Sequence, residues 1–434
     1  MDTSYFSPSL ATTWVFASTL ITGLLLKLYL ASRQIRHVAN HRSRVPTAFA
    51  GRISLHDHQK AADYSLAKSR LELIDLGFGL AVLLGWTLLG GLSALNQVLI
   101  GLISAGMWQQ IALVTCFVAI NAAMDMPMTL YKTFVLEERF GFNKMTWRLW
   151  LTDSIRGAGV GALVGLPVLA LVLWVMQASG ALWWIWAWCV WAGLSLALMV
   201  IYPSVIAPLF NKFEPLQDES IKARVKQLMD RCGFSAKGLF VMDGSKRSSH
   251  ANAYFTGFGA AKRVVFFDTL LSKLSAAELD AVLAHELGHF KHKHIANRLV
   301  MMFATSLVGL AVLGWLSTQV WFYTGLGVQP NFYGTPNDAL ALLLFMMCAP
   351  AFTFFLSPIF ARLSRAQEFE ADAYAIAQTN GADLASALVK LYQDNASTLT
   401  PDPMFVKFYY SHPPATERLS CMGLPDHVLN GVHG

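Results

Sequence analysis

The stretch from residue 285 to residue 322 reads HELGHFKHKHIANRLVMMFATSLVGLAVLGWLSTQVWF, which joins a polar, histidine-rich segment directly to a long apolar run. About 20 consecutive apolar residues are enough to cross a bilayer as a helix. The apolar part, residues 299–322, therefore predicts a membrane span. The histidines that precede it are then expected to lie at one face of the membrane.

Seven apolar runs in total are long enough to cross a membrane. They lie at residues 14–31, 75–95, 108–130, 157–178, 182–206, 299–322 and 338–361. The composition agrees, because 55% of the residues are hydrophobic and only 14% are charged, whereas soluble domains average about 25% charged residues. The mean hydropathy is +0.45. The sequence predicts a mainly α-helical, polytopic membrane protein with seven transmembrane helices.

Lysine and arginine residues are restricted to alternate connections between these runs. None occurs in residues 1–13, 96–107, 179–181 or 323–337, whereas Arg33 and Arg36 closely follow the first run. Positive residues tend to stay on the cytoplasmic side, so the N-terminus is expected outside and the basic segments inside. This topology explains the net charge of +6 and the pI near 9.0 without nucleic-acid binding. A bacterial inner membrane is favoured, or the endoplasmic reticulum if the source is eukaryotic.

The HELGH sequence at the start of the quoted stretch has the spacing of a metal site. On a helix, His285 and His289 share one face, so both imidazoles can hold one Zn²⁺ while Glu286 reaches a water molecule at the metal. The alternative is a pair of solvated histidines near the membrane interface. His292 falls on the same predicted face and is a competing ligand, whereas His294 is expected to point away.

A catalytic metal site needs a third protein ligand and one open position. Residues 368–372 (EFEAD) supply candidates, because Glu368 and Asp372 share a helical face while Glu370 is turned about 200° away. One carboxylate could bind the metal and the other could orient a histidine; the alternative is a charged, solvated helix. Two predicted spans separate His289 from Glu368, so both return to the cytoplasmic side and can meet.

The spans and the metal motif divide the chain into four parts. Residues 1–206 are expected to form a membrane domain of five helices with cytoplasmic loops at 32–74 and 131–156. The other parts are a cytoplasmic domain at 207–298 that carries the HELGH sequence, two membrane helices at 299–361, and a cytoplasmic C-terminal part at 362–434 that completes the metal site.

The cytoplasmic domain is expected to combine a small sheet with the metal-binding helix. Strand-like runs occur at 238–242, 252–258 and 263–268, and the last two are joined around residues 257–262, which predicts a small antiparallel β-sheet. A helix is predicted to start at Ser275, because Glu278 three residues later completes the capping-box pattern. This helix carries the HELGH sequence.

Several separated motifs resemble those of the type I CAAX prenyl endopeptidase family, seven-span membrane zinc metalloproteases of the gluzincin kind. They are residues 139–144 (RFGFNK), 208–212 (PLFNK), 252–255 (NAYF), 285–289 (HELGH), 368–372 (EFEAD) and 411–414 (SHPP). The similarity extends from residues 58–64 to residues 417–418, which is most of the chain. It implies a barrel of seven helices around a large water-filled chamber, closed on the cytoplasmic side by the metalloprotease domain.

The resemblance also implies roles for individual residues. His285, His289 and Glu368 would bind one Zn²⁺ per chain. Glu286 would be the catalytic base, and Asp372 would support the ligands. The sequence departs from the family at Glu370, where eukaryotic members are expected to have Gln, and in the short loop at 323–337.

Two further polar residues, Asn252 and His412, are candidates for the catalytic site. Asn252 stands at the head of a predicted strand, and His412 lies in the sequence YSHPP. The pattern alone favours the simpler interpretation, in which Asn252 is a turn residue and His412 is a loop histidine. The resemblance implies that they contact the substrate backbone or the developing oxyanion.

The expected activity is hydrolysis of peptide bonds near the C-terminus of prenylated proteins or peptides by zinc-activated water. The expected partners are such a substrate and the lipid bilayer, with no nucleic acid. Two alternatives remain open: a quality-control metalloprotease acting on unprenylated membrane peptides, and a non-enzymatic seven-span transporter with an incidental metal site. An intramembrane protease of the site-2 type is disfavoured, because the HELGH sequence precedes a span instead of lying inside one.

Overall fold

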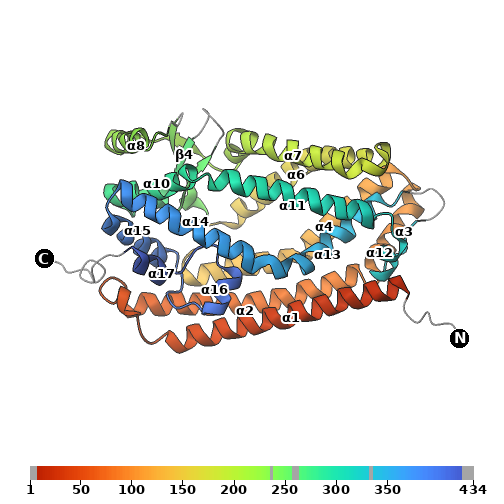
Figure 1. The fold of residues 1–434 in the computed structure, drawn as a ribbon, viewed down its shortest axis with the longest axis horizontal. Coiled ribbons are helices and arrows are strands. Elements are labelled where there is room, and N and C mark those ends of the chain that lie inside the picture. Colours follow the sequence, from red (N-terminus) through yellow and green to blue (C-terminus); the bar gives the residue numbers. More distant parts are fainter. Residues whose placement is uncertain (1–6, 235–237, 257–262, 332–335, 423–434) are drawn as a thin grey trace.

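Long helices run side by side along the molecule, and the shorter elements gather at its two ends (Figure 1). The computed structural model describes residues 7–234, 238–256, 263–331 and 336–422. The membrane region contains α1 (Pro8–His41), α2 (Leu55–Trp86), α3 (Gly91–Ile103), α4 (Met107–Tyr131), α6 (Trp147–Ala178), α7 (Trp183–Ile201), α11 (His294–Leu316), α13 (Asp338–Thr353) and α14 (Ser357–Gln378). The three-residue helix α5 (Glu138–Phe140) follows α4.

The predicted membrane spans correspond to long helical stretches. Six stretches among the described residues are long and apolar enough to cross a membrane: Pro8–His41, Met107–Phe140, Trp147–Ala178, Gly180–Leu209, His294–Leu316 and Asp338–Gln378. The pair α2 and α3, bent by 49°, passes the same test together. The expectation of seven transmembrane helices is confirmed when this bent pair is counted as one span.

The helices around the candidate site lie at one end of the molecule. They are α8 (Glu219–Arg231), α9 (Asp268–Leu271), α10 (Ala276–Lys291), α15 (Gly381–Asp394), α16 (Pro403–Tyr409) and α17 (Ala415–Cys421). Helix α12 (Val320–Gly325) lies at the opposite end, near α3 (Figure 1). Buried apolar side chains of α8, α10, α15 and α17 pack with those of the sheet in one hydrophobic core. This core holds the helix with the HELGH sequence at a fixed place beside the membrane helices.

The small sheet has four strands in the order β1-β2-β4-β3. Its strands are β1 (Phe213–Pro215), β2 (Gly238–Met242), β3 (Ala253–Thr256) and β4 (Arg263–Phe267). The expectation of a purely antiparallel sheet was wrong, because β2 pairs with β4 in parallel while the other two pairs are antiparallel. The reason is that β3 takes the outer edge, so β4 returns beside β2 in the same direction. The connection expected at 257–262 lies outside the described residues.

The capping box predicted at the start of α10 is present. The Ser275 side chain accepts from the Glu278 backbone N–H, and the Glu278 carboxylate accepts from the Ser275 N–H. Glu278 also accepts from the Ser386 hydroxyl at 2.6 Å and the Lys390 ammonium at 2.7 Å, both on α15. One buried carboxylate thus starts α10 and fixes it to α15.

A second polar contact fixes α1 against α16. Asp402 caps α16 through the backbone N–H groups of Met404 and Phe405. Its carboxylate also accepts from the Arg33 guanidinium at 2.9 and 3.2 Å, and its own N–H donates to the Gln34 side chain at 2.7 Å. The start of α16 is therefore held beside the first membrane helix.

Replacing Glu278 is expected to destabilise the protein. The variant Glu278→Ala removes the acceptor for three donors, and losing such partners costs about 1–3 kcal/mol. Thermal unfolding of the detergent-solubilised protein should show a lower Tm. The control is Glu219→Ala, whose carboxylate is 83% exposed and pairs with Lys222; it should change stability by less than about 0.5 kcal/mol. Equal Tm values for the two variants would contradict the role given to Glu278.

Candidate active site

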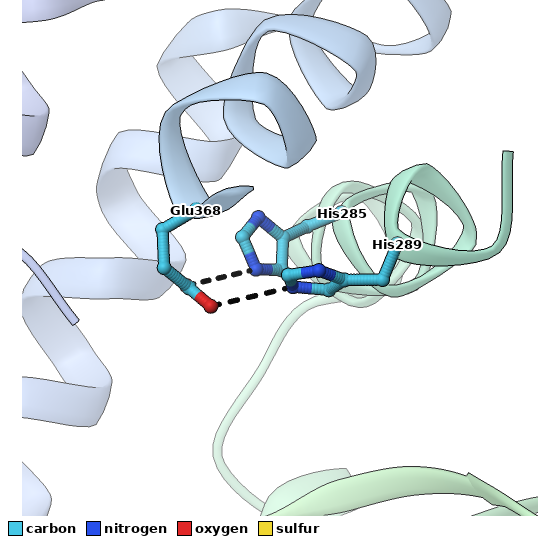
Figure 2. Close-up of side chains that lie close together, drawn as sticks. All are labelled: His285, His289 and Glu368. Carbon is cyan, nitrogen blue, oxygen red and sulfur yellow. Dashed lines mark ion pairs between the residues drawn. The ribbon is translucent and has the colours of Figure 1, made fainter. Parts of the chain in front are cut away.

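Helices α10 and α14 bring three potential metal ligands together. His285 and His289 project from one face of α10, and Glu368 projects toward them from α14 (Figure 2). The Nε2 atom of His285 lies 3.5 Å from Glu368 Oε2, and that of His289 lies 3.4 Å from Glu368 Oε1. One ligand atom from each residue can be chosen so that all three lie within 4.8 Å of one another.

This arrangement fits a bound cation. The Glu368 side chain is 3% exposed, and its Oε2 has no hydrogen-bond partner among the described residues. The Arg418 Nη1 atom lies 3.9 Å from this oxygen. A buried carboxylate oxygen without a hydrogen bond is costly, and a metal ion between it and the two imidazoles would remove that cost. Two histidines and one glutamate are a donor set of catalytic zinc sites, which leave a further position open.

Close packing of α10 against α14 sets the distance between the two histidines and Glu368. Gly288, in the middle of the HELGH sequence, faces Ala371 of α14. A Cβ atom at Gly288 would lie 3.0 Å from the Ala371 Cα and 3.2 Å from its carbonyl oxygen. Glycine therefore lets the two backbones approach, and the approach brings Glu368 within reach of both histidines.

The outer ring nitrogen of His285 is held by Asp372. The two atoms, His285 Nδ1 and Asp372 Oδ1, lie 2.8 Å apart, and the Arg418 Nε donates to the other carboxylate oxygen at 2.7 Å. With Nδ1–H donating to Asp372, Nε2 is the ring nitrogen that faces Glu368 and would bind a metal. Such outer partners fix the ring and the tautomer of ligating histidines. The structure therefore places Asp372 beside a potential ligand instead of among the three.

The outer ring nitrogen of His289 is held by His294. Their Nδ1 atoms lie 3.0 Å apart, and His294 Nε2 lies 2.8 Å from Glu370 Oε2. The expectation that His294 points away was wrong, because Lys293 adopts a left-handed conformation with φ 57° that ends α10 and starts α11. The residue spacing along α10 therefore does not predict where the side chains of α11 point.

The protonation of His289 suits metal binding. Burial and the positive charge of a protonated His285 lower the pKa of His289 to about 4. The His289 imidazole is therefore neutral at pH 7 and offers a lone pair to a cation. Burial opposes the charge on His285 as well, but hydrogen bonds to Asp372 and Glu368 raise the pKa of His285 to about 9, so a metal would have to displace a proton from that ring.

A large cavity connects the cluster with the membrane helices. This cavity, here called the chamber, has a volume of about 1330 Å³, above the roughly 300–1,000 Å³ of ordinary ligand pockets. Its lining includes His285, His289 and Glu368, together with Lys27 of α1 and Leu76 of α2. A peptide segment can therefore lie in one continuous space that reaches from the candidate metal site to the first two membrane helices.

The other predicted site residues also line the chamber. Glu286, Asn252 and His412 all contribute to its wall. Burial raises the pKa of the Glu286 carboxyl. The Nε2 atom of His412 lies 3.5 Å from Glu368 Oε1, whereas Asn252 uses its side-chain oxygen to accept from the Ala253 N–H.

The segment that carries His412 is fixed by contacts that the sequence did not indicate. Arg365 of α14 donates to the carbonyl oxygens of Val406 and Tyr410, at 2.9 and 2.7 Å. The Tyr392 hydroxyl donates to the carbonyl oxygen of Pro413 at 3.1 Å. These contacts hold the segment on both sides of His412, so the imidazole stays close to Glu368.

Two residues of the site, Arg418 and His294, were not identified from the sequence. Arg418 is 46 positions from its partner Asp372, and an arginine in a seven-residue helix gives no local signal of such a contact. His294 could have been identified only by recognising that the helix breaks at Lys293, a residue that does not usually adopt a positive φ.

Comparisons with known proteins show which family the chain belongs to. A family model described as "CAAX prenyl protease N-terminal, five membrane helices" matches residues 34–212, and one described as "Peptidase family M48" matches residues 215–422. A CAAX prenyl protease 1 homolog of Arabidopsis thaliana is 35% identical over 92% of this chain and 95% of that protein. CAAX prenyl protease 1 of Saccharomyces cerevisiae is 33% identical over 91% of each. The chain belongs to the type I CAAX prenyl protease family.

The fold of this family member agrees with a solved relative. The crystal structure of S. mikatae Ste24p matches with a TM-score of 0.89 and 30% identity, covering 95% of this chain and 99% of that one. The protein is therefore a multi-pass integral membrane metalloprotease that acts on protein or peptide substrates. The alternatives of a transporter with an incidental metal site and of a quality-control protease are not favoured.

Separating α10 from α14 is expected to weaken metal binding. The variant Gly288→Val places a branched side chain against the Ala371 backbone, and misplacing reacting groups by about 1 Å can cost about 100-fold in rate. Metal content and peptidase activity should both fall. The control is Gly157→Val on α6, where a Cβ atom meets nothing within 4 Å, and it should behave as the wild type. A fully metallated, active Gly288→Val protein would show that this packing does not set the site.

Proposed function

We propose that this protein hydrolyses a peptide bond near the C-terminus of prenylated proteins, with Zn²⁺ as its metal and its active site on the cytoplasmic side. The observation that carries the proposal is the chamber, whose wall includes both the His285, His289 and Glu368 cluster and residues of α1 and α2. A lipid-linked peptide needs a polar site for its peptide bond and an apolar environment for its lipid. The chamber offers the first, and an apolar pocket of about 230 Å³ lined by Leu20, Leu24 and Leu80 adjoins it through the shared residues Lys27 and Leu76.

His285, His289 and Glu368 would hold the metal. When bound, zinc polarises the scissile carbonyl and lowers the pKa of water to about 7. Glu286 would accept the proton from the attacking water and deliver it to the leaving amine. A carboxyl whose pKa is raised by burial is closer to the operating pH than an exposed one, which suits both proton transfers.

The edge of the sheet would align the substrate. β3 is the outer strand in the order β1-β2-β4-β3, and Asn252, which immediately precedes it, lines the chamber. An extended peptide can add to such an edge by main-chain hydrogen bonds. The Asn252 side chain would then contact the substrate backbone near the scissile bond.

The placement in the membrane rests on the distribution of basic residues. Lysine and arginine are absent from residues 1–13, 96–107, 179–181 and 323–337, and positive residues favour the cytoplasmic side. The N-terminus would lie outside, and the end of the molecule that carries α10 would face the cytoplasm. The membrane would be a bacterial inner membrane, or the endoplasmic reticulum in a eukaryote.

Cleavage of one CaaX-type peptide tests this proposal. The purified protein should cleave the prenylated form in preference to the unprenylated form. The variant Glu286→Gln should keep its metal but lose about 10²–10⁴-fold in rate, the usual contribution of a general base. Equal cleavage of both peptide forms would favour turnover of unprenylated membrane peptides, and full activity of the variant with metal retained would refute the role of Glu286.

Replacing His412 tests its role in stabilising the oxyanion. His412→Ala should lower kcat by about 10²–10³-fold, as removal of an oxyanion donor does. The metal content should not change, because the three proposed ligands remain. Metal analysis alongside kinetics checks both statements, and loss of metal in this variant would show that His412 is needed for the metal site instead.

A further inference from the structure

A second group of potential metal ligands lies where α10 ends and α11 begins. His292, His294 and Glu370 each offer one ligand atom, and these atoms lie within 4.8 Å of one another. His292 follows the last residue of α10, His294 begins α11, and Glu370 comes from α14. None of the three belongs to the proposed catalytic metal ligands.

The backbone conformation at Lys293 brings the two histidines to the same side. Its φ of 57° and ψ of 27° are left-handed, a region that non-glycine residues seldom adopt. The imidazole rings of His292 and His294 consequently stack, with centroids 5.5 Å apart and planes inclined by 18°. Backbone strain of this kind persists where the surroundings enforce it, which is often at functional sites.

A cation from solution can reach this group. The His292 side chain is exposed, and that of Glu370 is 56% exposed. His294, at 3% exposure, lies beneath them with its Nε2 directed to Glu370 at 2.8 Å. Two imidazoles and one carboxylate suit Zn²⁺ and similar transition metals, whereas Mg²⁺ prefers oxygen ligands alone.

We propose that His292, His294 and Glu370 form a second, weaker Zn²⁺ site whose occupation inhibits the peptidase. The inhibition rests on the proposed function; the existence of the site does not. The exposed position and the neighbouring Lys291 and Lys293 make this site weaker than the buried catalytic one.

The two sites are coupled through one hydrogen bond. If His289 binds the catalytic metal through Nε2, its Nδ1 carries a proton and donates to His294 Nδ1, across 3.0 Å. His294 then carries its own proton on Nε2 and donates it to Glu370. A zinc ion bound at His294 Nε2 moves that proton to His294 Nδ1. The N–H groups of His289 and His294 would then face each other, and the hydrogen bond between the two rings would be lost.

At the catalytic site, His289 would lose the hydrogen bond that orients its ring. Removing an outer partner of a ligating histidine costs about 10–100-fold in metal affinity or activity. Activity should therefore fall when added zinc fills the second site, even though enough zinc is present to fill the catalytic site. Each zinc ion should also weaken the binding of the other.

Equilibrium dialysis against increasing free Zn²⁺ tests the site directly. The full chain, without a histidine tag, is assayed for bound zinc and for cleavage of the CaaX-type peptide. The wild type should take up a second equivalent, and activity should fall over the same zinc range. Mg²⁺ at the same concentrations should have no effect. A wild type that binds a single equivalent throughout the inhibitory range would overturn the proposal.

Two variants identify the residues responsible. His292→Ala should need at least about tenfold more zinc for the second equivalent and for half-inhibition, the lower end of what even an outer-shell partner contributes. Its activity at low zinc should equal that of the wild type. Glu370→Gln keeps an acceptor for His294 but loses the charge, so its second equivalent should also bind more weakly.

The matched control is His56→Ala, which removes a histidine whose side chain is 88% exposed and lies near Asp57. It should bind zinc and be inhibited as the wild type is. Identical zinc uptake and inhibition of His292→Ala and wild type would refute the site. A protein that takes up a His292-dependent second equivalent without cleaving any peptide would support the site and contradict only the proposed function.

Discussion

The contact between Gly288 and Ala371 determines the geometry of the whole site. It brings α10, which belongs to the core on one side of the molecule, against α14, which returns from the membrane. His285 and His289 on one helix thereby meet Glu368 on the other. Ligands that come from two helices separated by two membrane spans can form a metal site only if both helices are held rigidly. The capping box of α10 and the contact of Glu278 with α15 provide that rigidity for one of them.

Each of the two histidines proposed as metal ligands has a different partner at its Nδ1 atom. His285 contacts Asp372, which is paired with the buried Arg418, whereas His289 contacts the ring of His294, which leads to the exposed Glu370. The first arrangement is closed to solvent, because both charges are buried and paired. The second is open at Glu370. This asymmetry means that ions in solution can influence His289 much more readily than His285.

Local patterns in the sequence were sufficient to predict the features that depend only on residues close together in the chain. The spacing of His285 and His289, the cap at Ser275 and the apolar runs all reflect interactions within one helix or with lipid. The even number of spans between His289 and Glu368 explained why distant motifs could meet. The parallel pairing of β2 with β4, the reversal at Lys293 and the contact of Arg418 with Asp372 depend on tertiary packing. No local pattern encodes them, so the sequence did not reveal them.

The most direct test of this account is the position of the metal ion. Anomalous diffraction from crystals of the purified protein, recorded on both sides of the zinc absorption edge, locates zinc without any assumption about ligands. The account predicts the strongest peak within about 2.0–2.2 Å of His285 Nε2, His289 Nε2 and a Glu368 oxygen. A peak bound by other residues, or no peak at this cluster in crystals of active protein, would contradict it.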